Sequence, residues 1–257
     1  GTKTWKDAKN QDGIRPDEVV INLLADGVAT GQTATVSKAS DWSYEFKNLP
    51  KYKGGKEIVY SVTEDAVDGY TTTIDGYDVT NTHKPSLVSI SGTKTWEDAD
   101  NQDGIRPESI TITLLADGKA TDQTVTVSEK TNWTYEFTDL PEFKDGKKIV
   151  YTVEEETVKG YETTIDGFDI TNTHTPSTTK VVGKKTWDDA DNKDKLRPES
   201  ITVRLYANDK EVRHAIVTAK DNWSYSFENL PEYENGKKIA YSLSEDAVKG
   251  YTTVIKG

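Results

Sequence analysis

Hydrophobic and polar residues alternate along much of the chain. Trp42, Tyr44 and Phe46 are separated by single polar residues, and the same alternation returns at Trp133 and Tyr135. A period of two is typical of a β-strand with one buried face. No segment keeps apolar residues at helical spacing for three turns. The pattern therefore predicts β-strands and no long helix.

Further runs of this kind in the first copy of the pattern lie at residues 19–25, 58–64, 70–74 and 77–81. Turn motifs such as Asp-Gly, Gly-Gly and Asn-Leu-Pro separate them. About seven short strands in some 90 residues is the density of an antiparallel β-sandwich of the immunoglobulin-like type. We therefore predict an all-β fold built from such sandwiches.

The pattern is copied three times along the chain. Gly-Thr-Lys-Thr-Trp begins at Gly1 and at Gly92, and Gly-Lys-Lys-Thr-Trp begins at Gly183, so each start lies 91 residues after the previous one. A fixed period of this kind indicates tandem copies of one structural unit. We predict three domains over residues 1–84, 85–175 and 176–257, the last of them without its final strand.

Short joints connect the predicted domains. Lys-Pro-Ser around Pro85 and Thr-Pro-Ser around Pro176 each follow a Thr-His pair. Proline favours extended backbone, so we expect stiff joints and an elongated rod. His83 and His174 lie at these joints without a second ligand at strand or helix spacing. We interpret them as solvated linker residues, and we expect no metal.

Composition and charge exclude several classes of protein. The net charge is −12, and acidic and basic residues are interspersed, which disfavours a nucleic-acid partner. No apolar run approaches the roughly 18 residues that cross a bilayer, so we expect no membrane insertion. The chain has no cysteine and no methionine, which suits oxidising surroundings. We expect an extracellular segment whose export signal and anchor lie outside it.

Three polar residues in each of the first two copies lie on the same face of a predicted strand as apolar residues two positions away. In the second copy, Lys94 shares a strand face with Ile90 and Trp96. Glu155 and Asn172 hold equivalent places in later strands, beside apolar residues two positions earlier. The corresponding residues of the first copy are Lys3, Glu64 and Asn81. The alternation predicts that all three side chains enter the core.

A buried lysine, glutamate and asparagine are costly unless they meet one another. Burial disfavours charge, so it lowers the pKa of a lysine and raises that of a glutamate. A neutral amine can attack a carboxamide that a protonated acid polarises, and the product is an amide bond with release of ammonia. The alternative is a buried Lys–Glu salt bridge with the asparagine as a hydrogen-bonding spectator. The residue pattern leaves both open.

These residues belong to longer motifs that give the chain a close resemblance to a known family. The motifs are Gly-Thr-Lys-Thr-Trp, then Asn-Leu-Pro followed by Tyr-Lys-Gly-Gly-Lys-Glu-Ile-Val-Tyr, then Tyr60-x-Val62-x-Glu64 with Gly-Tyr, and finally Asp-Val-Thr-Asn81. They resemble the Cna B-type repeats of the collagen adhesins of Gram-positive surface proteins. The Tyr-x-Val-x-Glu stretch is similar to the family's E-box, although the usual proline before Gly-Tyr is missing.

The resemblance implies a prealbumin-like sandwich and a spontaneous intramolecular Lys–Asn isopeptide bond assisted by the E-box glutamate. Carried over residue by residue, it implies cross-links between Lys3 and Asn81, promoted by Glu64, and between Lys94 and Asn172, promoted by Glu155.

The third copy departs from this pattern. Lys185 and Glu245 are present, but the sequence reaches Gly257 before any residue equivalent to Asn81. We expect Lys185 and Glu245 to lack an asparagine partner in this chain. Either the last strand is missing, or a strand of another chain fills the edge that it leaves.

The resemblance implies a structural stalk in a cell-wall-anchored bacterial adhesin, beside neighbouring adhesin domains and with a possible host extracellular matrix ligand elsewhere in the protein. The alternative is an adhesive module that itself binds a host matrix protein. An enzyme is disfavoured, because there is no His-supported nucleophile, phosphate-binding glycine loop or metal cluster in the sequence, and we expect no cofactor.

An acidic turn over residues 98–104 resembles a calcium loop. Its glycine is one place late for the EF-hand spacing, no glutamate closes the loop, and Lys195 replaces the glycine in the third copy. We prefer a solvated turn, with calcium binding as the alternative.

Overall fold

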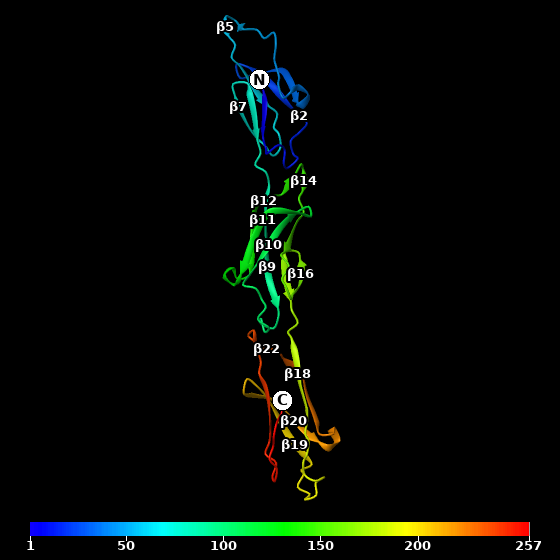
Figure 1. Ribbon diagram of the computed structural model, residues 1–257. Helices are drawn as coiled ribbons and strands as arrows, with labels where there is room; N and C mark the ends of the chain where they lie inside the picture. The colour runs from blue at the N-terminus through cyan, green and yellow to red at the C-terminus, as the bar shows by residue number, and fades with distance from the viewer. Residues whose placement is uncertain (257) are drawn as a thin grey trace. The chain divides into compact units, whose positions relative to one another are not determined.

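The computed structural model describes residues 1–256, and its regular secondary structure consists of β-strands apart from three short 3-10 turns (Figure 1). The chain forms two compact units. The first contains Gly1–Ser91, Thr113–Val125 and Glu136–Glu154, and the second contains Gly92–Ile112, Thr126–Tyr135 and the residues from Glu155 onward. The strands follow the predicted period: β2 (Glu18–Ala25), β10 (Ser109–Ala116) and β19 (Ser200–Ala207) start 91 residues apart. The described residues contain no α-helix.

The first repeat contains two three-stranded sheets and a small hairpin. One sheet has the order β1 (Lys3–Lys6), β8 (Asp78–Thr82), β7 (Thr71–Asp75), and the other has the order β3 (Val28–Ser37), β2, β6 (Tyr60–Glu64). The hairpin is β4 (Tyr52–Lys53) with β5 (Lys56–Glu57), and η1 (Lys38–Ser40) is a single 3-10 turn. The apolar residues of β2 alternate because Val19, Ile21 and Leu23 point into the core. The predicted sandwich is confirmed.

The second and third repeats resemble the first, with the added strands β12 and β21 that the first repeat lacks. In the second repeat, one sheet has the order β12 (Thr134–Pro141), β9 (Leu87–Glu97), β17 (Asp169–Thr173), β16 (Glu162–Asp166). The other sheet has the order β11 (Lys119–Ser128), β10, β15 (Tyr151–Glu155). The repeat also contains the hairpin of β13 (Phe143–Lys144) and β14 (Lys147–Lys148) and the 3-10 turn η2 (Glu129–Thr131). The third has β18 (Thr178–Lys184) with β21 (Ser224–Pro231), β20 (Lys210–Thr218) with β19 and β24 (Tyr241–Glu245), the hairpin β22 (Tyr233–Glu234) with β23 (Lys237–Lys238), and η3 (Ala219–Asp221). Residues 246–256 contain no strand.

The first and last strands of the first two repeats pair in parallel, which differs from the purely antiparallel arrangement predicted. In β1 and β8, Lys3 is opposite Val79 and Trp5 is opposite Asn81. In β9 and β17, Lys94 is opposite Ile170. These strands come from opposite ends of a repeat, so no tight hairpin forces them to run antiparallel. The pairing brings the two ends of each repeat together.

Two local predictions need correction. Trp42, Trp133 and Trp223 lie in turns with φ of 54°, 55° and 57°. The predicted aromatic strand therefore starts only after the tryptophan in the second and third repeats, and residues 44–47 of the first repeat form no strand. The long strand β3 escaped prediction altogether. It forms the edge of its sheet and is exposed over most of its length, so it carries no alternation of apolar residues.

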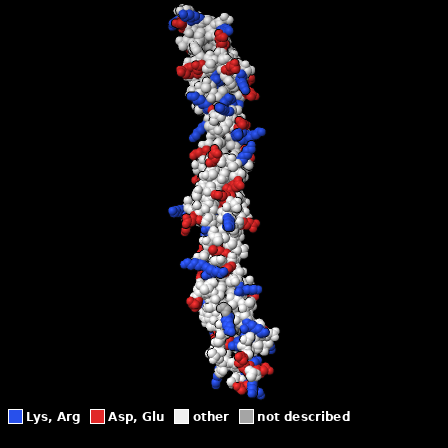
Figure 2. Space-filling view, viewed as in Figure 1, with Lys and Arg blue, Asp and Glu red and all other residues white. Residues whose placement is uncertain are grey.

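The described surface is polar and mixed in charge. On the face shown in Figure 2, basic and acidic side chains are interspersed, and neither sign forms a continuous patch. No helix within residues 1–256 has the length and apolar character needed to span a bilayer.

Candidate functional site

The predicted lysine and asparagine of the first two repeats are buried in the core. Lys3 and Lys94 are each 4% exposed, and Asn81 and Asn172 are fully buried. Lys3 starts β1 and Asn81 lies near the end of β8, while Glu64 ends β6 in the opposite sheet. The site therefore takes one residue from each of three strands. Period-two alternation put each side chain on the inner face, as the sequence predicted.

The strand register makes the lysine and the asparagine diagonal neighbours. Lys3 is opposite Val79, and Asn81 follows two positions later on the same buried face. A strand spacing of ~4.8 Å and a rise of ~3.3 Å per residue separate their Cα atoms by roughly 8 Å. Lys94 and Asn172 have the same relation, because Lys94 is opposite Ile170. The two side chains together are long enough to bridge this separation.

The lysine of each site contacts the glutamate. Lys3 Nζ is 3.0 Å from Glu64 Oε1, with both side chains 0% exposed. Lys94 Nζ is 3.6 Å from Glu155 Oε1, and it donates a hydrogen bond of 2.9 Å to the carbonyl oxygen of Thr95. The Lys3–Glu64 contact is close but lacks the alignment of a hydrogen bond. The carboxylate oxygen that faces each lysine has no hydrogen-bond donor.

The asparagine amides have no hydrogen-bond partners. Neither Nδ2 nor Oδ1 of Asn81 makes a hydrogen bond, and the same is true of Asn172. A buried polar group left unpaired costs about 1–3 kcal/mol, so each amide carries two such penalties. Buried polar groups are almost always paired in proteins, and an exception requires an explanation. The interpretation of the asparagine as a hydrogen-bonding spectator does not match this geometry.

Burial lowers the pKa of both lysines. Desolvation is the main effect for Lys3, and the attraction of the nearby Glu64 only partly opposes it. For Lys94, desolvation outweighs the attraction of Glu155 and lowers the pKa to about 8. A pKa near 8 leaves an appreciable neutral fraction of the amine close to neutral pH. The neutral amine is the nucleophilic form.

Two further contacts at the site were not predicted. The Thr72 hydroxyl donates to Glu64 Oε2 at 3.0 Å, and the Thr163 hydroxyl donates to Glu155 Oε2 at 2.9 Å. Each threonine occupies one carboxylate oxygen and leaves the other facing the lysine. The sequence could have indicated this threonine, because a threonine stands two residues after the tyrosine of Gly-Tyr in all three copies.

A tryptophan covers each lysine amine. Lys3 Nζ lies 4.2 Å from the centre of the Trp5 ring, and Lys94 Nζ lies 4.0 Å from the centre of the Trp96 ring. The ring of Trp5 also packs edge-on against that of Trp42, with 5.3 Å between the ring centres, and both pack against the core. These rings exclude water from the amine.

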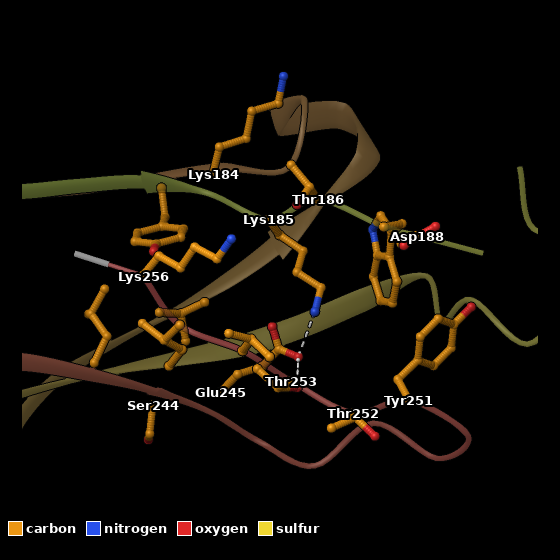
Figure 3. Close-up of a pocket in the computed structure, with 16 residues that line it drawn as sticks. Lys184, Lys185, Thr186, Asp188, Ser244, Glu245, Tyr251, Thr252, Thr253 and Lys256 are labelled. Carbon is orange, nitrogen blue, oxygen red and sulfur yellow. Dashed lines mark hydrogen bonds and ion pairs between the residues drawn. The ribbon is translucent and has the colours of Figure 1, made fainter. Parts of the chain in front are cut away.

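The third repeat keeps part of the arrangement. Lys185 Nζ donates to Glu245 Oε1 at 2.8 Å, and the Thr253 hydroxyl donates to the same oxygen at 2.9 Å (Figure 3). These residues line an open pocket of about 530 Å³.

The acidic turns are more than solvated loops, which corrects the prediction. Asp7 is 2% exposed and accepts hydrogen bonds from Arg15 Nε at 2.8 Å and from the Tyr70 hydroxyl at 2.9 Å. At the equivalent Asp98, burial raises the pKa, but hydrogen bonds led by that of Arg106 outweigh it and lower the pKa to about 2. Within residues 1–256, no three His, Asp or Glu side chains are grouped as metal ligands.

The joint histidines are also partly buried instead of solvated. His83 Nε2 is 2.9 Å from Asp12 Oδ2, and Nδ1 is 2.9 Å from the carbonyl oxygen of Gly69. His174 makes the equivalent contacts with Asp103 and Gly160. The histidine side chains are 16% exposed. They tie each joint to the acidic turn of the preceding repeat.

Tandem β-sandwich repeats, two of them with this buried site, define a class of protein, and comparison with known proteins identifies it. The family model of the Cna protein B-type domain matches residues 1–82, 90–173 and 181–257. The chain belongs to this family.

A collagen adhesin of Staphylococcus aureus is 49% identical over 263 residues, covering 100% of this chain and 22% of that relative. The chain thus spans about a fifth of the length of the curated relative. The crystal structure of two B repeat units (B1B2) of the collagen-binding protein of Staphylococcus aureus is 48% identical, with a TM-score of 0.63, covering 100% of this chain and 70% of that one.

Proposed function

We propose that the chain is part of the stalk of a bacterial cell-surface adhesin, and that an isopeptide bond between lysine and asparagine cross-links each of its first two repeats. One observation carries the cross-link: Asn81 and Asn172 are fully buried beside a lysine and a glutamate, yet their amides have no hydrogen-bond partners. The reaction removes the unpaired amide nitrogen, because Nδ2 leaves as ammonia and the lysine nitrogen takes its place on the carbonyl carbon.

The reaction is a single acyl transfer within the chain. The neutral Nζ of Lys3 attacks Cγ of Asn81, the Nζ–Cγ bond forms, and the bond from Cγ to Nδ2 breaks. Nδ2 leaves as ammonia, carrying the proton that Nζ loses. The acid form of Glu64 polarises the Asn81 carbonyl and transfers the proton between the two nitrogens. Each site reacts once, so the chain is not an enzyme that turns over an added substrate.

The surrounding residues prepare this step. Thr72 fixes one oxygen of Glu64, which leaves Glu64 Oε1 directed at Lys3. Trp5 covers the amine and keeps water from it. Water would otherwise solvate the charged form of the lysine and compete as a nucleophile. The same arrangement in the second repeat uses Thr163 and Trp96.

The cross-link would suit a load-bearing segment. It joins the first strand of a repeat to the last, and force applied through the chain enters at these two strands. The covalent bond carries that load before the hydrogen bonds between the strands shear. We place the stalk outside the cell, attached to the cell wall through parts of the protein beyond this chain and beside its other adhesin domains. The matrix ligand would bind elsewhere in the protein.

Intact mass spectrometry tests the cross-link. The unaltered chain should be lighter than its sequence mass by two molecules of ammonia, one for each of the first two repeats. Asn81→Ala and Asn172→Ala should each remove one deficit, and the double variant should remove both. A chain with its full sequence mass would contradict the proposed chemistry.

The stalk role has a separate test. The relative is a collagen adhesin, so immobilised collagen is the natural probe for the adhesive alternative. We expect no saturable binding of this chain to collagen in surface plasmon resonance. Saturable binding would favour the adhesive module over the stalk, whether or not the cross-links are present.

A further inference from the structure

A turn in each of the first two repeats contacts the hairpin of the next repeat through glycine. Within the first unit, the amide of Gly146, at the tip of the β13–β14 hairpin, donates a hydrogen bond of 3.0 Å to the carbonyl oxygen of Gln11. A Cβ atom on Gly13 would lie 2.4 Å from Gly146 Cα. The two glycine backbones are therefore in direct contact, with no room for a side chain on Gly13.

The same contact recurs within the second unit. The amide of Gly236, at the tip of the β22–β23 hairpin, donates to the carbonyl oxygen of Gln102 at 3.0 Å. A Cβ atom on Gly104 would again lie 2.4 Å from the glycine opposite, at Gly236 Cα. Two independent copies of the contact indicate a built element of the repeat.

The aspartate between the glutamine and the glycine of each turn contacts the linker between repeats. Asp12 Oδ2 accepts hydrogen bonds from the backbone amide of Ser86 at 2.8 Å and faces His83 Nε2 at 2.9 Å. Asp103 does the same with Ser177 at 2.8 Å and His174 at 3.0 Å. The Gln-Asp-Gly turn thus fixes the linker with its side chain and the following hairpin with its backbone.

The third repeat has Lys-Asp-Lys in place of Gln-Asp-Gly. Lys195 keeps the local backbone, with φ of 53° and an amide that donates to Asn192 at 3.0 Å, as Gly13 donates to Asn10 at 3.0 Å. A lysine Cβ at this place would enter the space that a docked glycine hairpin needs. No rotamer relieves this clash, because the backbone fixes Cβ.

We propose that the glycine of the Gln-Asp-Gly turn decides whether a following B-type repeat docks, and that Lys195 prevents the third repeat from docking a glycine-tipped hairpin. The partner of each docking turn is the Gly-tipped hairpin of a B-type repeat. The hairpin of the first repeat has the same glycine at its tip, and a Cβ on Gly55 would meet no atom within 4 Å. This hairpin would dock on a repeat whose turn contains glycine. It would not dock on the third repeat of a second copy of the chain, because Lys195 stands in that turn.

Amide hydrogen exchange, measured by NMR on the full chain, tests this docking. The amides of Gly146 and Gly236 should exchange at least tenfold more slowly than that of Gly55, which has the same hairpin position without a partner. Gly104→Lys should abolish the protection of Gly236 and leave that of Gly146 unchanged. Lysine is compatible with this backbone, as Lys195 demonstrates.

Gly118→Lys is the matched control, because Gly118 has φ of 74° and open space around its Cβ position. It should leave Gly236 protected. The amide of Lys185, which donates to Trp223 at 2.8 Å, should stay protected in every variant and report that the third repeat is folded. Should Gly104→Lys unfold the second repeat, Gly236→Ala tests the contact from the other side and should also remove the protection of residue 236. Unchanged protection at residue 236 in both variants, or equal exchange of Gly55, Gly146 and Gly236 in the unaltered chain, would overturn the proposal.

Discussion

Replacing Glu64 by glutamine should leave the first repeat without its cross-link. The glutamine side chain has the same size and can still accept the hydrogen bond from Thr72, but it cannot transfer protons between Lys3 and Asn81. The first repeat of this variant should therefore keep its ammonia, and the mass deficit of the chain should fall from two ammonia molecules to one. The second repeat provides the internal control, since its Glu155 is unaltered.

The loss of the cross-link has a predictable cost. The bond closes a loop from residue 3 to residue 81, and the chain-entropy relation for a loop of this length gives about 4.5 kcal/mol. One kcal/mol shifts the melting temperature of a domain of 60–100 residues by about 4–8 °C. The first repeat should therefore melt roughly 20–35 °C lower in Glu64→Gln. Differential scanning calorimetry of the full chain should resolve this shifted transition.

Glu45→Gln is the matched control, because the Glu45 side chain is 68% exposed and lies outside the core. It should change neither the mass deficit nor the melting temperature. A Glu64→Gln chain that retains both deficits would refute the role of Glu64. A chain that loses one deficit without a large fall in melting temperature would instead refute the stability argument.

Three further predictions follow from the same contacts. Thr163→Val should slow bond formation in the second repeat, because Glu155 loses the donor that fixes it, whereas Thr164→Val should not; quenched samples of newly synthesised chain, analysed by mass, would report both rates. Bond formation in that repeat should accelerate as the pH rises through about 8, the pKa of Lys94, because the neutral amine reacts, and a rate independent of pH would contradict this step. Folding lowers the pKa of Asp98 to about 2. The ionised Asp98 therefore stabilises the fold fully above the pKa of the unfolded chain, near 4, and this stabilisation is lost as the pH falls through 2. Asp98→Asn should remove this part of the acid sensitivity in chemical denaturation curves.

The sequence predicted the buried site well because the residues that form it lie on strands with one buried face. Period-two alternation placed Lys3, Glu64 and Asn81 on inner faces, and the repeated motif placed their counterparts in the second copy. It could not predict that β1 and β8 run parallel, because pairing direction depends on how the chain crosses between sheets. Edge strand β3 carried no signal, because an exposed strand has no reason to alternate.

Contacts between distant segments were the main features that sequence reasoning missed. The acidic turn looked solvated because nothing near Asp7 in sequence shows that Tyr70 reaches it. The linker histidines looked exposed for the same reason, since Asp12 and Gly69 are brought to His83 by the fold. Local patterns specify which face of a strand is buried, while the partners of a turn are set by tertiary packing.

Tandem mass spectrometry of a proteolytic digest tests the central proposal most directly. The account predicts a branched peptide in which Nζ of Lys94 is joined to the side-chain carbonyl carbon of Asn172, with the mass of the two parent peptides less one ammonia. Recovery of Lys94 and Asn172 only in separate, unmodified peptides would contradict it.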